Sequence, residues 1–204
     1  MGLFDKRKNA PMLGIDISST TVKLLELSRN GDRYRVESYA VTALPQDSVV
    51  EKTLNSVDDV ANSIRSVVAQ SRSKTKTAVA AVAGSSVINK VVPMPAGLSD
   101  DDLETQLTLE ADQYIPYPLD EVAIDFEVQG FLPGREDQVN VLVAACRSET
   151  IDARVDALEQ AGLETKIMDV EAYAMERTFD LLRQQAEIDE RATVAIVDIG
   201  ATMT

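Results

Sequence analysis

Two segments near opposite ends of the chain share one pattern, in which an apolar strand ends in aspartate and continues into small and hydroxyl residues. The first spans Gly14 to Lys23 and the second Ile196 to Thr204, and their aspartates, Asp16 and Asp198, are about 180 residues apart. Turns of Ser, Thr and Gly let backbone amides approach phosphate oxygens, and a nearby carboxylate can hold the water shell of a metal ion. One such loop is weak evidence, because strand ends often carry Asp, Ser or Thr to satisfy turn hydrogen bonds. Two loops facing each other would form a phosphate clamp.

The residues after the first loop predict an α/β arrangement. Three apolar runs separated by polar turns predict a meander of strands over residues 12–17, 22–27 and 34–42, followed by a loop over 43–56. Apolar residues then recur at helical spacing from Val57 to Val68, with Ser56 and Asp59 placed as a capping pair. Residues 78–83 are apolar on both faces and are expected to form a central parallel strand.

A change of pattern after Gly84 predicts an inserted α+β unit. Its first strand, 86–92, is expected to end at Pro93, and Ser99 caps a helix of about 15 residues that stops before two prolines. Two longer strands follow, and then a helix begins at Ser148 with Ile151, Val155 and Leu158 on one face. The remaining elements are the unit's longer strands at 122–131 and 138–147, and, after it, a strand at 164–170, a helix at 171–185 and a strand at 192–199.

Composition excludes several classes of function. The 204 residues hold 20 Lys and Arg against 34 Asp and Glu, a formal charge of −14, which argues against nucleic acid as the main partner. The absence of histidine removes the Ser/His/Asp and Cys/His triads and His-ligated zinc. A lone cysteine, Cys146, forms no internal disulfide and fits a reducing cytoplasm. The longest apolar runs, such as 78–83, are far shorter than the roughly 20 residues of a transmembrane helix.

Four segments carry a family resemblance. They are Met1 to Phe4, Leu13 to Leu27, Glu110 to Val122 and Val197 to Met203. Taken together they resemble the PilM family, the cytoplasmic actin-like proteins of type IV pilus assembly. The paired loops also resemble the first and second phosphate loops of the wider actin superfamily, which includes sugar kinases, heat-shock chaperones and the division protein FtsA. The resemblance covers the whole chain and implies an α/β, actin-like (ribonuclease H-like) ATPase fold.

The resemblance also implies a division into subdomains. Residues 1–11 would be an N-terminal extension, 12–84 and 163–190 subdomain 1A, 85–162 an inserted FtsA-type α+β subdomain 1C, and 191–204 the start of subdomain 2A. Only the first strand of 2A would then be present. Because the family places the adenosine-binding region in subdomains 2A and 2B, the chain is expected to be truncated after the second phosphate loop, and tight ATP binding by it alone is not expected.

ATP and Mg²⁺ are the ligands that the resemblance implies. Asp16 and Asp198 would hold magnesium through water, and Lys23 would face a phosphate. Actin has glycine where Ser18 and Thr20 stand here, so this sequence departs from that pattern in the first loop. No catalytic residue is assigned. The nucleotide-binding residues would be Asp16, Ser18, Ser19, Thr20 and Lys23 of the first loop and Asp198, Gly200, Ala201 and Thr202 of the second.

The implied partner is the cytoplasmic N-terminal peptide of the inner-membrane protein PilN, received in a groove between subdomains 1A and 1C. Tyr114, Ile115, Pro116 and Tyr117 are candidate contacts, because aromatic residues at a proline-stiffened helix end present apolar surface at small entropic cost. The alternative is that Tyr114, Ile115 and Tyr117 only pack the helix onto the sheet of 1C. Other pilus platform and motor proteins, and a second copy of the chain, are further possible partners.

Three classes of function stay open. The first is a nucleotide-responsive scaffold of pilus assembly with at most weak ATPase activity, located in the cytoplasm and peripheral to the inner membrane through its partner. The second is an FtsA-like filament protein of cell division, and the third an actin-fold kinase or ATPase. The sequence favours the scaffold, because it offers no convincing general base beyond Asp16 and Asp198 and no signature of a substrate pocket.

Overall fold

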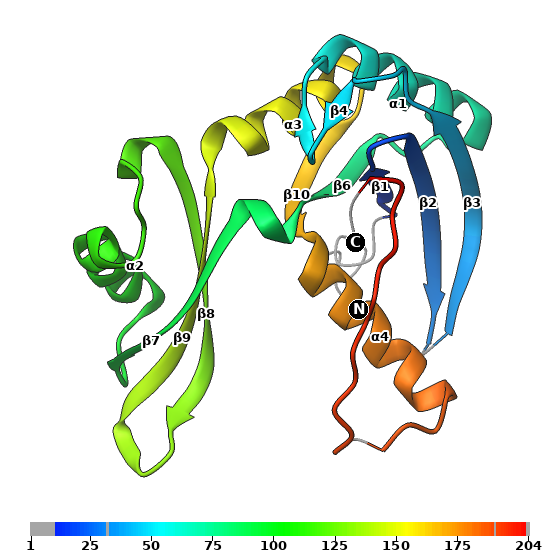
Figure 1. Cartoon of the computed structure of the whole chain (residues 1–204). Helices are drawn as coiled ribbons and strands as arrows, with labels where there is room; N and C mark the ends of the chain where they lie inside the picture. The colour runs from blue at the N-terminus through cyan, green and yellow to red at the C-terminus, as the bar shows by residue number, and fades with distance from the viewer. Residues whose placement is uncertain (1–10, 32, 190, 203–204) are drawn as a thin grey trace, which may run out of the picture. The chain divides into compact units, whose positions relative to one another are not determined.

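The structure is a computed structural model that describes residues 11–31, 33–189 and 191–202. The chain forms two compact units (Figure 1). The first comprises the chain up to Ala83 and from Asp152 onward, and the second comprises Gly84–Ile151. The predicted N-terminal extension lies almost entirely outside the described residues. Within the described chain, no helix has the length and apolar character needed to cross a bilayer.

A mixed five-stranded sheet forms the centre of the first unit, with strand order β10-β6-β1-β2-β3. β1, β2 and β3 form the predicted antiparallel meander, and β6 lies parallel to both β1 and β10. The prediction of a central parallel strand after the first helix is therefore confirmed. The strands are β1 (Leu13–Ile17), β2 (Thr21–Asn30), β3 (Arg33–Ala43), β6 (Thr77–Val82) and β10 (Glu164–Val170).

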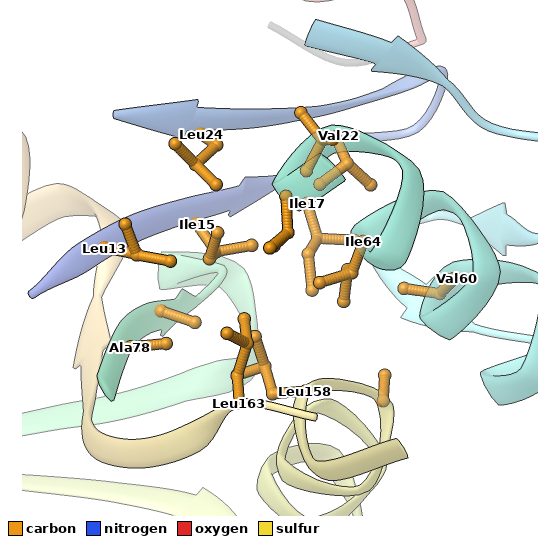
Figure 2. Packing of buried hydrophobic residues seen from close by; sticks show 14 of the residues in the cluster. Leu13, Ile15, Ile17, Val22, Leu24, Val60, Ile64, Ala78, Leu158 and Leu163 are labelled. Atoms are coloured by element: carbon orange, nitrogen blue, oxygen red, sulfur yellow. The ribbon is translucent and has the colours of Figure 1, made fainter. Parts of the chain in front are cut away.

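The core of this unit lies between the sheet and helix α1 (Val57–Ser71). Figure 2 shows Ile15, Ile17 and Val22 of the β1–β2 hairpin directed toward Ile64 of the helix. α1 begins as the sequence predicts, because the Ser56 side chain accepts a hydrogen bond from the Asp59 amide. Alternation along β1 and β2 therefore buries one face of the hairpin and leaves the other face for Asp16 and Lys23.

The segment predicted as a loop over 43–56 contains a small hairpin. β4 (Val49–Val50) pairs with β5 (Thr53–Leu54) through a two-residue turn. Glu51 and Lys52 form that turn with φ of 47° and 67°, as the tight turns of hairpins require. The sequence gives no sign of this turn, because such positions usually carry Asn or Gly.

The second unit is a three-stranded antiparallel sheet, ordered β7-β9-β8, with one helix. Leu103 and Leu107 of the helix pack on Val92, Val141 and other residues of the sheet. Ser99 caps the helix as predicted and accepts from the Asp102 amide, and a separate 3₁₀ turn, Ala111–Gln113, follows the helix. The elements are β7 (Val87–Pro95), α2 (Asp100–Glu110), β8 (Val122–Leu132) and β9 (Arg135–Arg147), with further 3₁₀ turns at Gly84–Ser86 and Leu119–Glu121.

Pro93 does not end its strand, which corrects the prediction. β7 continues to Pro95, and Pro93 pairs across the sheet with Asn140 of β9. β7 is an edge strand, and an edge strand tolerates proline because its outward N–H groups have no ladder partner.

Helix α3 (Ser148–Gln160) packs differently from the prediction. It was assigned to the inserted unit, but Ala157 and Leu158 lie in the core of the first unit. Its buried residues are Arg154, Ala157 and Leu158, whereas Ile151 and Val155 are only half-buried. The compact first unit resumes at Asp152, whereas the predicted subdomain 1C extends to residue 162. Gly162 follows the helix with φ 80°, a left-handed conformation that glycine adopts readily where a helix ends.

The last predicted strand is not formed. β10 and helix α4 (Glu171–Gln185) have the predicted bounds, but residues 192–199 make no strand in the structure. Ile196, Val197 and Ile199 are exposed there. A strand exists only through hydrogen bonds to a neighbour, and none of the described strands pairs with this segment.

Candidate functional site

The first loop is a tight turn between β1 and β2. The Ser18 amide donates to the Thr21 carbonyl at 3.0 Å, and the Ser18 hydroxyl accepts from the Thr21 amide at 3.2 Å. None of residues 18–21 adopts a positive φ, so the turn does not need the glycines that actin has here. The Ser18 hydroxyl therefore closes the turn, while Ser19 and Thr20 lie at its tip.

Asp16 and Lys23 face each other across the hairpin. They are opposite in the register of β1 and β2, and Lys23 Nζ donates to Asp16 Oδ2 at 2.7 Å. Both side chains are about half exposed, at 49% and 46%. The hydrogen bond to Asp16 raises the pKa of Lys23 above its usual 10.5; partial burial opposes the rise, and the charges of Asp16, Tyr39 and Asp198 add to it.

The structure brings the second loop to the first. The Thr202 and Ser19 hydroxyls are hydrogen-bonded at 2.7 Å across 183 residues of sequence. Asp198 is close enough for its charge to act on the pKa of Lys23. Gly200 and Ala201, which lie between Asp198 and Thr202 in the chain, are exposed, and a bend begins at Ala201. The shared sequence pattern therefore corresponds to two loops that meet in space, although only the first follows a formed strand. Met203 and Thr204, the end of the pattern, lie outside the described residues.

The paired loops suit an anionic ligand with a hard cation. They offer one lysine, several hydroxyl groups and two carboxylates on a half-exposed surface. Among the described residues, no three His, Cys, Asp or Glu side chains come together as a metal site. Asp16 and Asp198 would therefore hold a magnesium ion through its water shell, and the ion would supply positive charge beside a phosphate.

The four candidate partner residues lie in the second unit and differ in exposure. Ile115 is 4% exposed and belongs to a core cluster with Ala111 and Ala145. Tyr114 packs partly against that cluster. Tyr117 is 41% exposed, and the Arg147 guanidinium lies 5.6 Å from its ring centroid. Packing therefore accounts for Ile115 and much of Tyr114, whereas Tyr117, next to the exposed Pro116, presents an aromatic surface.

A family model for the type IV pilus assembly protein PilM matches residues 14–204. The chain belongs to the PilM family. A solved PilM-PilN type IV pilus biogenesis complex resembles it with 26% identity and a TM-score of 0.76, covering 87% of this chain and 52% of that chain. The chain thus spans about half the length of that relative. This likeness confirms the prediction of an α/β fold of the actin-like class, as expected for a PilM-family protein.

Two other solved structures resemble this PilM-family chain more distantly. One is the cytoplasmic domain of EpsL, an inner membrane component of the type II secretion system of Vibrio cholerae, at 15% identity and TM-score 0.49, covering 78% of this chain and 57% of that chain. The other is a protein of unknown function with an actin-like ATPase fold from Bacteroides thetaiotaomicron, at 11% identity and TM-score 0.40, with coverages of 89% and 60%.

The sequence did not predict one polar network in the first unit of this PilM-family protein. Lys52 Nζ lies 3.2 Å from Glu171 Oε2 at the start of α4, and both side chains are mostly buried. Arg154 of α3, only 1% exposed, donates to the Lys52 carbonyl at 2.7 Å. The network ties the β4–β5 turn to two helices. No local sequence signal joins Lys52 to Arg154 and Glu171, which both follow it by more than a hundred residues.

Proposed function

We propose that the chain is part of a nucleotide-responsive scaffold of type IV pilus assembly, which binds the cytoplasmic N-terminal peptide of PilN and links the pilus platform to its motor. The observation that carries the proposal is the likeness to the solved PilM-PilN complex over 87% of the chain. The scaffold works in the cytoplasm and is held at the inner membrane by PilN.

ATP with Mg²⁺ is the nucleotide we propose for the paired loops. Lys23 binds a phosphate group, and the hydrogen bond between the Ser19 and Thr202 hydroxyls joins the two loops. Asp16 and Asp198 orient the water shell of the magnesium ion. The ion pair between Lys23 and Asp16 keeps both groups at one point of the hairpin. In this proposal the bound nucleotide sets conformation and its hydrolysis is at most weak, with Asp16 and Asp198 the candidate general bases that the sequence offers.

Full-length protein with single substitutions tests the nucleotide site. Asp16→Asn and Lys23→Met each remove one charge-assisted contact and are expected to weaken binding of a fluorescent ATP analogue about tenfold or more. The exposed Lys74, in the loop before β6, gives the matched control Lys74→Met, which is expected to bind normally. Normal nucleotide binding by both site variants would contradict the assignment.

The peptide partner is tested separately by calorimetry of a PilN N-terminal peptide. We propose that Tyr117 contacts the peptide, together with Pro116 and the edge of Tyr114, while Ile115 supports them from the core. Tyr117→Ala is expected to weaken peptide binding about tenfold, as loss of an aromatic hot spot does. Tyr34→Ala is the matched control, since that tyrosine is similarly exposed at 47% but lies in the first unit. Unchanged peptide binding by Tyr117→Ala would show that Tyr117 does not contribute to the interface.

A further inference from the structure

Basic residues gather at one edge of the first unit although the whole chain carries −14. This edge is where the parallel strands β1, β6 and β10 begin, because Leu13 lies beside Ala78, and Glu164 beside Thr77. The far end of the β2–β3 hairpin lies past it, since Leu13 pairs with Glu26 and β2 continues to Asn30. We call this surface the basic edge; its residues are Arg29, Arg33 and Arg35 of the hairpin and Arg72, Lys74 and Lys76 of the loop between α1 and β6.

The loop between α1 and β6 is built to present its cations. Hydroxyl and basic residues alternate from Ser71 to Thr77, and each basic residue is exposed while each hydroxyl residue is half-buried. The Ser73 amide donates to the Ser71 hydroxyl at 3.2 Å, and the Thr75 amide donates to the Ser73 hydroxyl at 3.1 Å. These short-range bonds order the loop while its three cations face solvent.

Hydrogen bonds hold this loop against the hairpin. Ser38 of β3 donates to the Ser71 carbonyl at 2.8 Å, and the Thr75 hydroxyl donates to Glu26 of β2 at 2.6 Å. Glu37 accepts from Ser28 and lies 3.6 Å from Arg35. Glu26 and Glu37 accept these hydrogen bonds and remain charged, as does the exposed Glu164, and the six basic residues of the edge outnumber these three carboxylates.

Exposed apolar and aromatic groups accompany these charges on the hairpin. Leu27 lies opposite Val36, and Arg29 stacks over Tyr34 with 5.5 Å from its carbon Cζ to the ring centroid. Val36 is 58% exposed and Tyr34 is 47% exposed. Tyrosine, arginine and aliphatic residues on one projecting ribbon are the types that sit at a lipid–water boundary, with their stems in the headgroup layer and their polar ends in water.

We propose that the basic edge binds the anionic surface of a lipid bilayer. The strand ends and loops of this edge carry cations on the outside, and a bilayer offers many phosphates over a wide area. The chain as a whole carries −14 with these six cations included, so the rest of the molecule is strongly acidic and is repelled from the same surface, which orients this edge toward the lipid. The Ser18–Thr21 turn is at the opposite end of β1, so the phosphate loops stay open to the cytoplasm.

Vesicle co-sedimentation of the full-length protein, without PilN peptide, tests the proposal. The probe is vesicles of phosphatidylglycerol and phosphatidylcholine in equal parts, with pure phosphatidylcholine for comparison. The triple variant Arg72→Gln/Lys74→Gln/Lys76→Gln is expected to bind on the order of a hundredfold more weakly, since each cation near an anionic surface contributes about fivefold. The control Lys90→Gln/Arg135→Gln/Arg191→Gln removes the same charge from exposed positions elsewhere and is expected to bind like wild type.

The salt dependence of vesicle binding is a second measurement, and it uses the wild-type protein alone, so it does not require that a variant folds. Binding of the wild type to anionic vesicles is expected to fall steeply as salt rises to physiological strength and beyond, because salt screens the attraction between the basic edge and the lipid phosphates. Equal binding to neutral vesicles, equal loss in the control triple, or no binding at low salt would each overturn the proposal. Tighter binding to duplex DNA than to vesicles at the same salt would assign the edge to nucleic acid instead. PilN peptide binding is measured in a separate experiment, so a failure to bind the peptide would not change the interpretation of the vesicle result.

Discussion

Replacing Arg154 with alanine is expected to lower the free energy of unfolding of the first unit by about 3 kcal/mol. Arg154 is 1% exposed on α3, and its guanidinium donates to the Lys52 carbonyl at 2.7 Å. That carbonyl belongs to a turn in which Lys52 has φ 67°, so the bond also holds a backbone conformation that non-glycine residues adopt rarely.

The magnitude follows from three contributions. A hydrogen bond from a charged donor contributes about 1.5–3 kcal/mol, and removal of a buried side chain as long as arginine leaves a cavity that costs about as much again. The variant also avoids burying a guanidinium, which returns part of that loss. For a chain of this length, about 3 kcal/mol corresponds to a fall in Tm of roughly 6 to 12 °C.

Urea unfolding and calorimetry of Arg154→Ala, Arg154→Leu and the control Arg33→Ala would measure the effect. Arg33 is exposed on the same unit, so its variant is expected to unfold like wild type. Arg154→Leu restores much of the buried volume but not the hydrogen bond, and is expected to lie between wild type and alanine. A loss below about 1 kcal/mol in Arg154→Ala, or full stability in Arg154→Leu, would show that the bond to Lys52 is not what holds the turn.

Three other predictions concern the first unit. Ser56→Ala removes the cap of α1 and is expected to cost about 1 kcal/mol in urea unfolding, and an unchanged midpoint would contradict the cap. Ile64→Ala opens a cavity in the main core, where Ile64 is 0% exposed, and is expected to cost about 2–5 kcal/mol by the same assay; a loss below 1 kcal/mol would contradict this packing. The pKa of Lys23 is raised in the folded state, so its pair with Asp16 contributes stability that is present below the unfolded value of 10.5 and lost as pH rises through the higher folded pKa. From neutral pH upward, the difference in Tm between wild type and Lys23→Met is therefore expected to shrink only as the pH passes 10.5, and a difference that vanished near neutral pH would exclude this pair as its source.

Elements with local signals could be predicted from the sequence. Ser56 and Ser99 begin their helices because a hydroxyl and an amide three residues later are enough to form a cap. β10 and α4 have the predicted bounds because the hydrophobic period changes within one residue, at Glu171. The turn at Ser18 was also predictable, since small hydroxyl residues between two apolar runs close a hairpin through their own side chains.

Features that depend on a distant neighbour could not be predicted in this way. Pro93 stays in its strand because β7 is at an edge of its sheet, and a single strand's sequence does not say which position it takes. α3 turns Arg154 inward because the carbonyl of Lys52 is there to accept its hydrogen bond, whereas periodicity alone favoured the neighbouring Ile151 and Val155. Ile115 is buried for a similar reason, since it packs with Ala145 of β9, and its contact with the partner peptide stays a prediction.

The two phosphate loops show most clearly what a repeated pattern determines. Both halves have an apolar run, an aspartate and hydroxyl residues, yet Leu13–Ile17 forms a strand between β2 and β6 and residues 192–199 form none. The pattern therefore predicts which chemical groups the loop carries. Whether the preceding residues form a strand depends on pairing partners that lie elsewhere in the sequence. The loops nevertheless meet through Ser19 and Thr202, because a hydroxyl contact needs only two side chains and no ladder of backbone bonds. If the loops bind nucleotide as we propose, ordering the exposed segment that carries Asp198 would lower the affinity, because that entropy is lost on binding.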